Sequence, residues 1–304
     1  MNILKAILFG LIEGITEWLP ISSSTHIELA DQILKMNATE GFFSVFEVVI
    51  QLGAIAAVIV VYFKQLWPFH TKKYAPGKSQ FANPQESGAI AGFQRFADNH
   101  LYMDKIVLWL KILISVLPAA VLGLVLDDLR DKYLNTWLVI GIMMLVYGAL
   151  FVLIELYFTP KHKARVTTMK KITWIDALLI GAIQCLALVP GTSRSGVTIL
   201  GALLIGFSRV CATEYSFFIA IPTMVGASLV KIVKSGFGFT GTEYVALIVG
   251  MAVAFAVSLF AIRFIIRYLK KHDFIPFGFY RIALGILILI LLVAGVLQGG
   301  SLAR

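Results

Sequence analysis

The sequence predicts an all-α integral membrane protein with about six transmembrane helices and two re-entrant helical hairpins in an inverted repeat. Of its 304 residues, 59% are hydrophobic and only 14% are charged, whereas charged residues make up about a quarter of an ordinary soluble domain. The mean hydropathy is +0.88, and the apolar residues fall in long runs. The net charge of +9 comes mostly from loops between these runs, an arrangement typical of membrane proteins. The sequence therefore argues against a soluble enzyme and against nucleic-acid binding.

Six apolar runs are long enough to cross about 30 Å of hydrocarbon at ~1.5 Å per helical residue. They cover residues 46–63, 106–126, 137–158, 215–233, 244–262 and 277–297. We expect each of these runs to form a transmembrane helix.

Two further apolar stretches, 3–19 and 174–189, differ from the six spans. Each ends at a proline followed by hydroxyl-rich residues, in Pro20-Ile-Ser-Ser-Ser-Thr-His26 and in Pro190-Gly-Thr-Ser-Arg-Ser-Gly196. Each stretch is either a full span or one arm of a re-entrant hairpin.

The charges of the loops favour the hairpins, because lysine and arginine accumulate on the cytoplasmic side. The loops 64–105, 161–171 and 263–271 carry an excess of basic residues and are predicted to be cytoplasmic. Residues 174–207 must then enter and leave the membrane on the cytoplasmic side. By the same count, residues 1–34 enter and return from the outer face, with an external N-terminus.

This pattern predicts a single membrane domain, 1–304, that contains an inverted repeat. Residues 1–126 form the first half, residues 172–297 form the second, and the span 137–158 links them. Irregular backbone at membrane depth is tolerated only where protein or a water-filled cavity satisfies its polar groups. We therefore expect the two hairpin tips to meet near the midplane and to form the functional site there.

Glu13 and Glu17 are four residues apart and share one face of an apolar helix. An acidic residue at bilayer depth costs roughly 2.5–3.5 kcal/mol on insertion scales, so each needs a compensating group. One interpretation is a structural pair, neutralised by protonation or by a lysine. The other is a functional pair that binds Mg²⁺ or Ca²⁺ together with the phosphate oxygens of a substrate.

Ser23 and His26 follow Pro20 and are three residues apart, so a resuming helix would place them on one face. Hydroxyl groups alone often only cap a helix. An imidazole, however, suits acid–base or nucleophilic chemistry near neutral pH. The nucleophile is left open between Ser23, His26 and a water molecule, and Ser24 is predicted to contact the substrate.

The stretch Pro190–Thr198 places an arginine at the break of an apolar hairpin. Arg194 needs an anionic partner there, and its planar guanidinium matches a phosphate with two donors. The residues predicted to complete a phosphate site at a helix N-terminus are Gly191, Thr192, Ser193, Ser195 and Thr198. The alternative is a salt bridge from Arg194 to Glu13 or Glu17 that only locks the hairpins together.

Three motifs now support an assignment to a known family: Glu13-Gly-Ile-Thr-Glu17-Trp-Leu-Pro-Ile-Ser-Ser23, Phe46-Glu-Val-Val-Ile-Gln-Leu-Gly53 and Pro190-Gly-Thr-Ser-Arg-Ser-Gly-Val-Thr198. Together they closely resemble the bacterial undecaprenyl-diphosphate phosphatases, the bacitracin-resistance protein family. The resemblance covers nearly the whole chain, and the order and spacing of the motifs match. It implies an inner-membrane enzyme that hydrolyses undecaprenyl diphosphate to the monophosphate carrier, an inverted repeat with re-entrant hairpins, and a dependence on a divalent metal.

Carried over residue by residue, Glu13 and Glu17 match the carboxylate motif and would hold the metal. Ser23 and His26 match the candidate nucleophile and base, and Arg194 with its flanking serines matches the phosphate binder. The predicted catalytic residues are therefore Glu17, Ser23, His26 and Arg194.

The sequence departs from the family pattern beside the histidine. Thr25 stands where the family has glycine, and Glu28 stands in a normally apolar turn. The resemblance therefore defines the backbone around His26 less well than the rest of the site.

The expected partners are a polyprenyl diphosphate lipid and the membrane, with the active site facing outward; a homodimer is left open. Bacitracin would be affected indirectly, through the shared substrate. The main alternative is a polyprenyl-phosphate or anion transporter with a midplane site, because inverted repeats with broken helices are typical of alternating access. An intramembrane prenyltransferase is a weaker alternative, because the aspartates at 127–131 lack a second such cluster.

Overall fold

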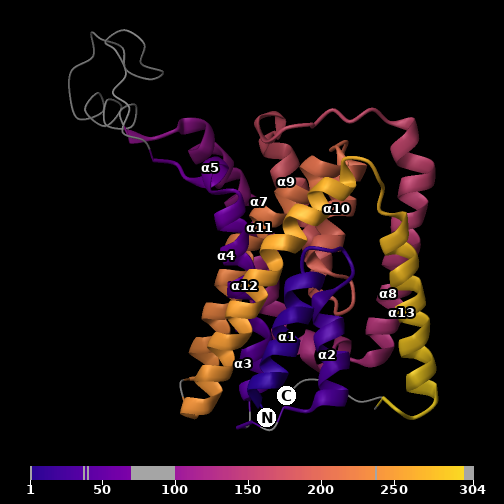
Figure 1. Ribbon diagram of the computed structural model, residues 1–304. Coiled ribbons are helices and arrows are strands. Elements are labelled where there is room, and N and C mark those ends of the chain that lie inside the picture. Colours follow the sequence, from indigo (N-terminus) through magenta and orange to yellow (C-terminus); the bar gives the residue numbers. More distant parts are fainter. Residues whose placement is uncertain (1, 37, 40, 70–99, 237, 298–304) are drawn as a thin grey trace.

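The computed structural model describes residues 2–36, 38–39, 41–69, 100–236 and 238–297 (Figure 1). Its α-helices are α1 (Asn2–Thr16), α2 (Ser23–Leu34), α3 (Phe42–Val49), α4 (Gln51–Val61), α5 (Phe63–Leu66), α7 (Met103–Leu129), α8 (Trp137–Leu153), α9 (Trp174–Gln184), α10 (Arg194–Leu204), α11 (Arg209–Ser235), α12 (Gly241–Leu269) and α13 (Ile275–Val293). Shorter π or 3₁₀ turns are η1 (Arg130–Leu134), η2 (Ile154–Phe158), η3 (Thr159–Lys161), η4 (Met169–Lys171) and η5 (Cys185–Leu188). Within the described ranges, strand-like pairing is limited to two isolated bridges, so the all-α prediction is confirmed.

Within the described part of the chain, six helical stretches are long and apolar enough to cross a membrane. They are Phe42–Val61, Met103–Leu126, Trp137–Phe158, Arg209–Ser235, Gly241–Leu269 and Ile275–Val293. Each overlaps one predicted run, so the six predicted spans are confirmed and the chain is a multi-pass membrane protein. The first predicted cytoplasmic loop, 64–105, falls largely on residues 70–99, which lie outside the described residues.

Four of the remaining helices, α1, α2, α9 and α10, form two hairpins that approach each other from opposite ends of the molecule. Figure 1 shows α1 and α2 rising from the end that holds the N-terminus, and the turn between them lies at mid-height beside the longer helices. The connection between α9 and α10 descends to the same level from the other end. The two turns contact each other through side chains and backbone. Re-entry of these hairpins into a bilayer stays a prediction.

Glycines allow the long helices to pack closely. A Cβ atom at Gly148 of α8 would lie only 2.8 Å from the backbone oxygen of Gly278 in α13. At Gly53 of α4, a Cβ atom would lie 2.1 Å from the backbone oxygen of Met251 in α12. Small residues at such positions bring helix backbones together, which is the main source of packing energy between helices in lipid.

The packing partners of the hairpins correspond to each other. The first arm of one hairpin, α1, packs along α12, and the first arm of the other, α9, packs along α7. An inverted repeat predicts this correspondence, because α1 and α7 of the first half would be equivalent to α9 and α12 of the second half. The boundaries 1–126, 137–158 and 172–297 of the inverted repeat stay predictions.

Candidate active site

The two hairpin turns carry most of the predicted site residues. Glu17 lies in the turn between α1 and α2, Ser23 is the first residue of α2, and Arg194 is the first residue of α10. Each of these helices follows a serine with left-handed backbone, Ser22 with φ of 73° and Ser193 with φ of 72°. Such a conformation costs roughly 1–3 kcal/mol for a residue with a side chain. Backbone strain is therefore concentrated at the two helix starts that form the site.

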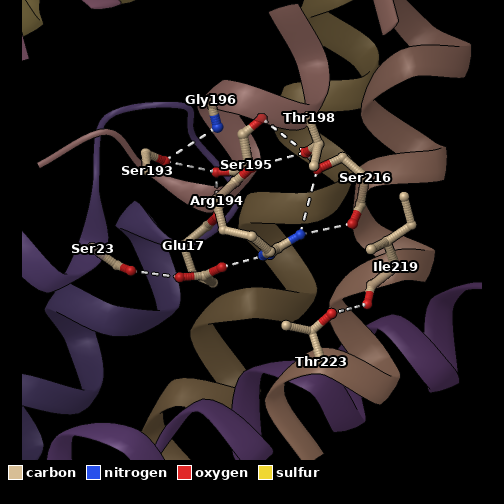
Figure 2. Close-up of polar contacts among 10 residues, drawn as sticks. All are labelled: Glu17, Ser23, Ser193, Arg194, Ser195, Gly196, Thr198, Ser216, Ile219 and Thr223. Carbon is tan, nitrogen blue, oxygen red and sulfur yellow. Dashed lines mark hydrogen bonds and ion pairs between the residues drawn. The ribbon is translucent and has the colours of Figure 1, made fainter. Parts of the chain in front are cut away.

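Glu17 joins the two hairpins (Figure 2). Its Oε2 accepts a hydrogen bond of 2.5 Å from the Ser23 hydroxyl. Its Oε1 accepts a charged hydrogen bond of 2.7 Å from Nη2 of Arg194. Both partners of this ion pair are largely buried, where little water screens their attraction. The structure thus contains the salt bridge that the sequence offered as an alternative, and the same contact holds Arg194 beside Ser23.

The other half of the Arg194 guanidinium is held by α11. Nη1 donates a hydrogen bond of 2.7 Å to the backbone oxygen of Ser216, whose hydroxyl is in turn 2.7 Å from that of Thr198 (Figure 2). Nε of Arg194 is buried and has no hydrogen-bond partner within the described residues. The guanidinium is therefore fixed in orientation, while its Nε–H donor stays unused within the described residues.

The start of α10 adds a second set of hydrogen-bonding groups to the site. The Ser193 hydroxyl caps the helix by accepting a 3.2 Å hydrogen bond from the amide of Gly196, and it lies 3.2 Å from the Ser195 hydroxyl. The Ser195 hydroxyl also donates to the backbone oxygen of Glu17, at 3.4 Å. Amide groups of a first helical turn have no partners inside the helix and attract anions. Arg194 and this turn together form a positively polarised surface.

Three other predicted phosphate ligands are tied into the protein. Gly191 has a φ of 86°, and a Cβ atom there would lie 2.7 Å from the backbone oxygen of Ile140. The Thr192 hydroxyl donates to the backbone oxygen of Val189 at 2.7 Å, and the Thr198 hydroxyl donates to that of Arg194 at 2.9 Å. Their contact with a substrate stays a prediction.

His26 has a separate set of partners. Its Nδ1–H donates to the backbone oxygen of Ser22 at 2.7 Å, so Nε2 is free to accept a hydrogen bond of 2.6 Å from the Tyr280 hydroxyl. The two rings are also stacked. Among the described contacts, none joins His26 to Ser23. Ser24 is exposed, and its hydroxyl lies 3.4 Å from that of Ser22.

Arg281 of α13 is a site residue that the sequence analysis missed. Its side chain is fully buried, with Nη1 donating to the backbone oxygen of Pro20 and Nη2 donating to those of Gly191 and Thr192. Arg281 therefore forms hydrogen bonds to both hairpin turns. A signal existed, because Arg281 is the only charged residue in the predicted span 277–297. Tyr280 and Ser216 carried no comparable signal.

Glu13 provides the test of whether a metal fits. Its carboxylate is fully buried, and neither oxygen has a hydrogen-bond partner within the described residues. A buried carboxylate without a partner needs a proton or a cation. In the described part of the chain, no group of three or more His, Cys, Asp or Glu side chains is arranged to hold a metal. Mg²⁺ commonly uses one or two carboxylates completed by water and substrate phosphate, so Glu13 and Glu17 fit that chemistry.

Known proteins match this sequence over nearly all of its length. The family model described as bacitracin resistance protein BacA matches residues 6–287. An undecaprenyl-diphosphatase from Enterococcus faecalis is 47% identical over 291 residues, which cover 96% of this chain and 97% of the relative. Undecaprenyl-diphosphatase from Acetivibrio thermocellus is 44% identical, over 97% of this chain and 99% of the relative. The chain belongs to the bacitracin resistance protein BacA family.

Proposed function

We propose that this protein hydrolyses undecaprenyl diphosphate to undecaprenyl phosphate and inorganic phosphate. The observation that carries the proposal is the junction of Arg194, Glu17 and Ser23 where the two hairpin turns meet. The activity named for the relatives, which align over nearly the whole chain, supports it. The reaction would return the lipid carrier to cell-wall synthesis and would confer bacitracin resistance through the shared substrate.

Arg194 and the first turn of α10 would bind the diphosphate. The buried Nε of Arg194 supplies a donor without a protein partner, and the helix start supplies amides and the hydroxyls of Ser193 and Ser195. These groups stay in place as negative charge develops around the transferring phosphorus, which is how preorganised donors lower a barrier. The polyprenyl tail would lie along the exposed apolar faces of the helices.

Ser23 is the nucleophile that the contacts favour. Its hydroxyl donates to Glu17, which accepts the proton as the Ser23 oxygen forms a bond to the terminal phosphorus. The bond from that phosphorus to the bridging oxygen breaks, and the lipid monophosphate leaves with the proton from Glu17. Water then cleaves the phosphoserine, which releases inorganic phosphate and restores the Ser23 hydroxyl. His26 is less suited to attack, because its Nε2 is bonded to Tyr280.

Glu13, together with Glu17, would hold a Mg²⁺ or Ca²⁺ ion. When bound, such an ion supplies positive charge against the diphosphate and against two carboxylates that would otherwise repel it. We further propose that the protein resides in the bacterial inner membrane with the site open to the outer face. The basic loop 161–171 and the basic residues at the C-terminal end of α12, 263–271, support this orientation.

The test is release of inorganic phosphate from undecaprenyl diphosphate by the purified protein in detergent. Wild-type protein should release phosphate, and Ser23→Ala should abolish release. Thr223→Val is the matched control, because the Thr223 hydroxyl only bonds back to Ile219 on its own helix (Figure 2). A transporter would instead move lipid across reconstituted vesicles without releasing phosphate. That result would contradict the proposed hydrolysis, whereas full activity of Ser23→Ala would show that Ser23 is not the nucleophile.

A further inference from the structure

The last turns of α12 carry three cations on one helix face. Arg263, Arg267 and Lys270 are spaced by four and three residues and are all exposed. Among the described residues, none of the three donates a hydrogen bond or forms a salt bridge. By contrast, Arg165 pairs with Asp176, and Lys170 pairs with Asp104. The stripe on α12 is therefore a concentration of positive charge that the protein itself does not neutralise.

These cations line a hollow between α4, α11 and α12. Its volume is about 310 Å³, and its walls include the apolar side chains of Val61, Ile262 and Ile266. The only acid in the lining is Glu214, whose carboxylate accepts a hydrogen bond from Tyr62. Three cations against one carboxylate leave the hollow with a net positive charge.

The hollow lies at the level of lipid headgroups. The 29 residues of α12 make a helix about 43 Å long, whereas the hydrocarbon core is about 30 Å thick, so the last turns of a membrane-spanning α12 would extend into the headgroup region. Large apolar side chains stand exposed nearby, including Phe63 at 47% and Phe264 at 59%. A molecule with an anionic headgroup and apolar chains could therefore contact the cations with its headgroup and the exposed apolar side chains with its chains.

We propose that this hollow binds the headgroup of an anionic phospholipid, with its phosphate between Arg263, Arg267 and Lys270 and its acyl chains along the neighbouring apolar side chains. Basic pockets between helices near the membrane surface commonly bind such headgroups. A zwitterionic headgroup fits less well, because its own cation would face the three side chains. The hollow is separate from the candidate catalytic residues: its lining contains none of them, and the hydrogen bonds of the Arg194 guanidinium within the described residues go to Glu17 and Ser216.

Native mass spectrometry of the full-length protein, with added phosphatidylglycerol or phosphatidylcholine, tests the proposal. Wild-type protein should retain phosphatidylglycerol in preference to phosphatidylcholine. The triple variant Arg263→Gln, Arg267→Gln, Lys270→Gln should lose this preference, at roughly fivefold weaker binding per charge removed. The matched control is Lys163→Gln, Lys170→Gln, Lys171→Gln, which removes the same charge from a loop outside the hollow and should bind like wild type.

Equal phosphatidylglycerol binding by wild type and the triple variant would overturn the proposal, as would an equal loss in the control. Displacement of the lipid by inorganic phosphate at matched concentration would assign the hollow to a free anion instead. If the triple variant does not purify as a monodisperse species, Arg267→Gln alone, a change of one exposed side chain, must still weaken binding. None of these measurements depends on phosphate hydrolysis, so they stand or fall separately from the proposed enzyme activity.

Discussion

Glu17 and Arg194 are 177 residues apart in sequence, yet their side chains form an ion pair of 2.7 Å where the two hairpin turns meet. The same carboxylate accepts a hydrogen bond from the Ser23 hydroxyl, so one buried acid links the candidate phosphate-binding arginine to the candidate nucleophile. Breaking a buried ion pair leaves an uncompensated charge, which makes each partner sensitive to substitution. The predictions below start from this junction.

Arg194→Lys should lower kcat/KM for phosphate release by about 100-fold, the usual effect of losing one preorganised donor. An ammonium group keeps the charge but does not reproduce a planar guanidinium that bonds Glu17 and Ser216 at once. Expression and membrane insertion should be normal. Near-wild-type turnover would indicate that the ion pair only holds the two hairpins together and has no role in catalysis.

Glu13→Gln should weaken activation by metal, because the amide keeps the shape of the side chain and loses its charge. In wild-type protein, chelation with EDTA should abolish phosphate release, and Mg²⁺ or Ca²⁺ should restore it. The variant should need a higher metal concentration while its thermal unfolding midpoint is unchanged or raised, since a buried carboxylate without a partner has been removed. Identical metal titrations would show that Glu13 is not a ligand.

Arg281→Met should destabilise the protein by about 3 kcal/mol or more, because backbone oxygens of both hairpin turns lose their buried charged donor. The thermal unfolding midpoint of the purified protein, followed by tryptophan fluorescence, measures this loss. Lys163→Gln, a change of an exposed loop residue, is the control and should leave the midpoint unchanged. A midpoint equal to that of wild type would show that the hydrogen bonds of Arg281 to the two hairpin turns do not stabilise the protein.

Tyr280→Phe should reduce phosphate release roughly fivefold, which corresponds to one hydrogen bond of ~1 kcal/mol. This loss of activity should act through His26, whose Nε2 accepts a hydrogen bond from the Tyr280 hydroxyl. A double-mutant cycle measures this coupling. In a His26→Ala background, Tyr280→Phe should not reduce phosphate release further. An additive loss of activity would show that Tyr280 acts independently of His26.

Cysteine labelling in intact cells tests the orientation. In a background that carries Cys185→Ser and Cys211→Ser, a cysteine at Gly238 should react with a membrane-impermeant thiol reagent. A cysteine at Lys163 should react only after the cells are opened. Both positions are exposed, so access from either side of the membrane decides the outcome. The reverse pattern would invert the proposed topology and close the site to the outer face.

Hydropathy along the chain was sufficient to place the six spans, because the free energy of transfer into lipid is a property of each residue and sums over a continuous run. The confirmed helices differ from the predicted runs mainly at their ends, as for the run 244–262, which extends to Gly241–Leu269. Helix ends carry charged and interfacial residues that hydropathy does not resolve. The motifs of the candidate site were equally accessible, because Glu17 lies inside an apolar stretch and Ser23 and Arg194 follow the breaks of two such stretches, where polar residues are costly and mark functional positions.

The sequence alone did not predict which hydrogen-bond donor in the site pairs with which acceptor. Ser23 and His26 are neighbours on one helix face, yet Ser23 bonds to Glu17 and His26 bonds to Tyr280, which lies 254 residues away. The unused carboxylate of Glu13 is likewise visible only once every neighbouring donor has been placed. Local periodicity states which face of a helix a side chain occupies, but hydrogen bonds act over about 3 Å, so their partners depend on how distant helices pack.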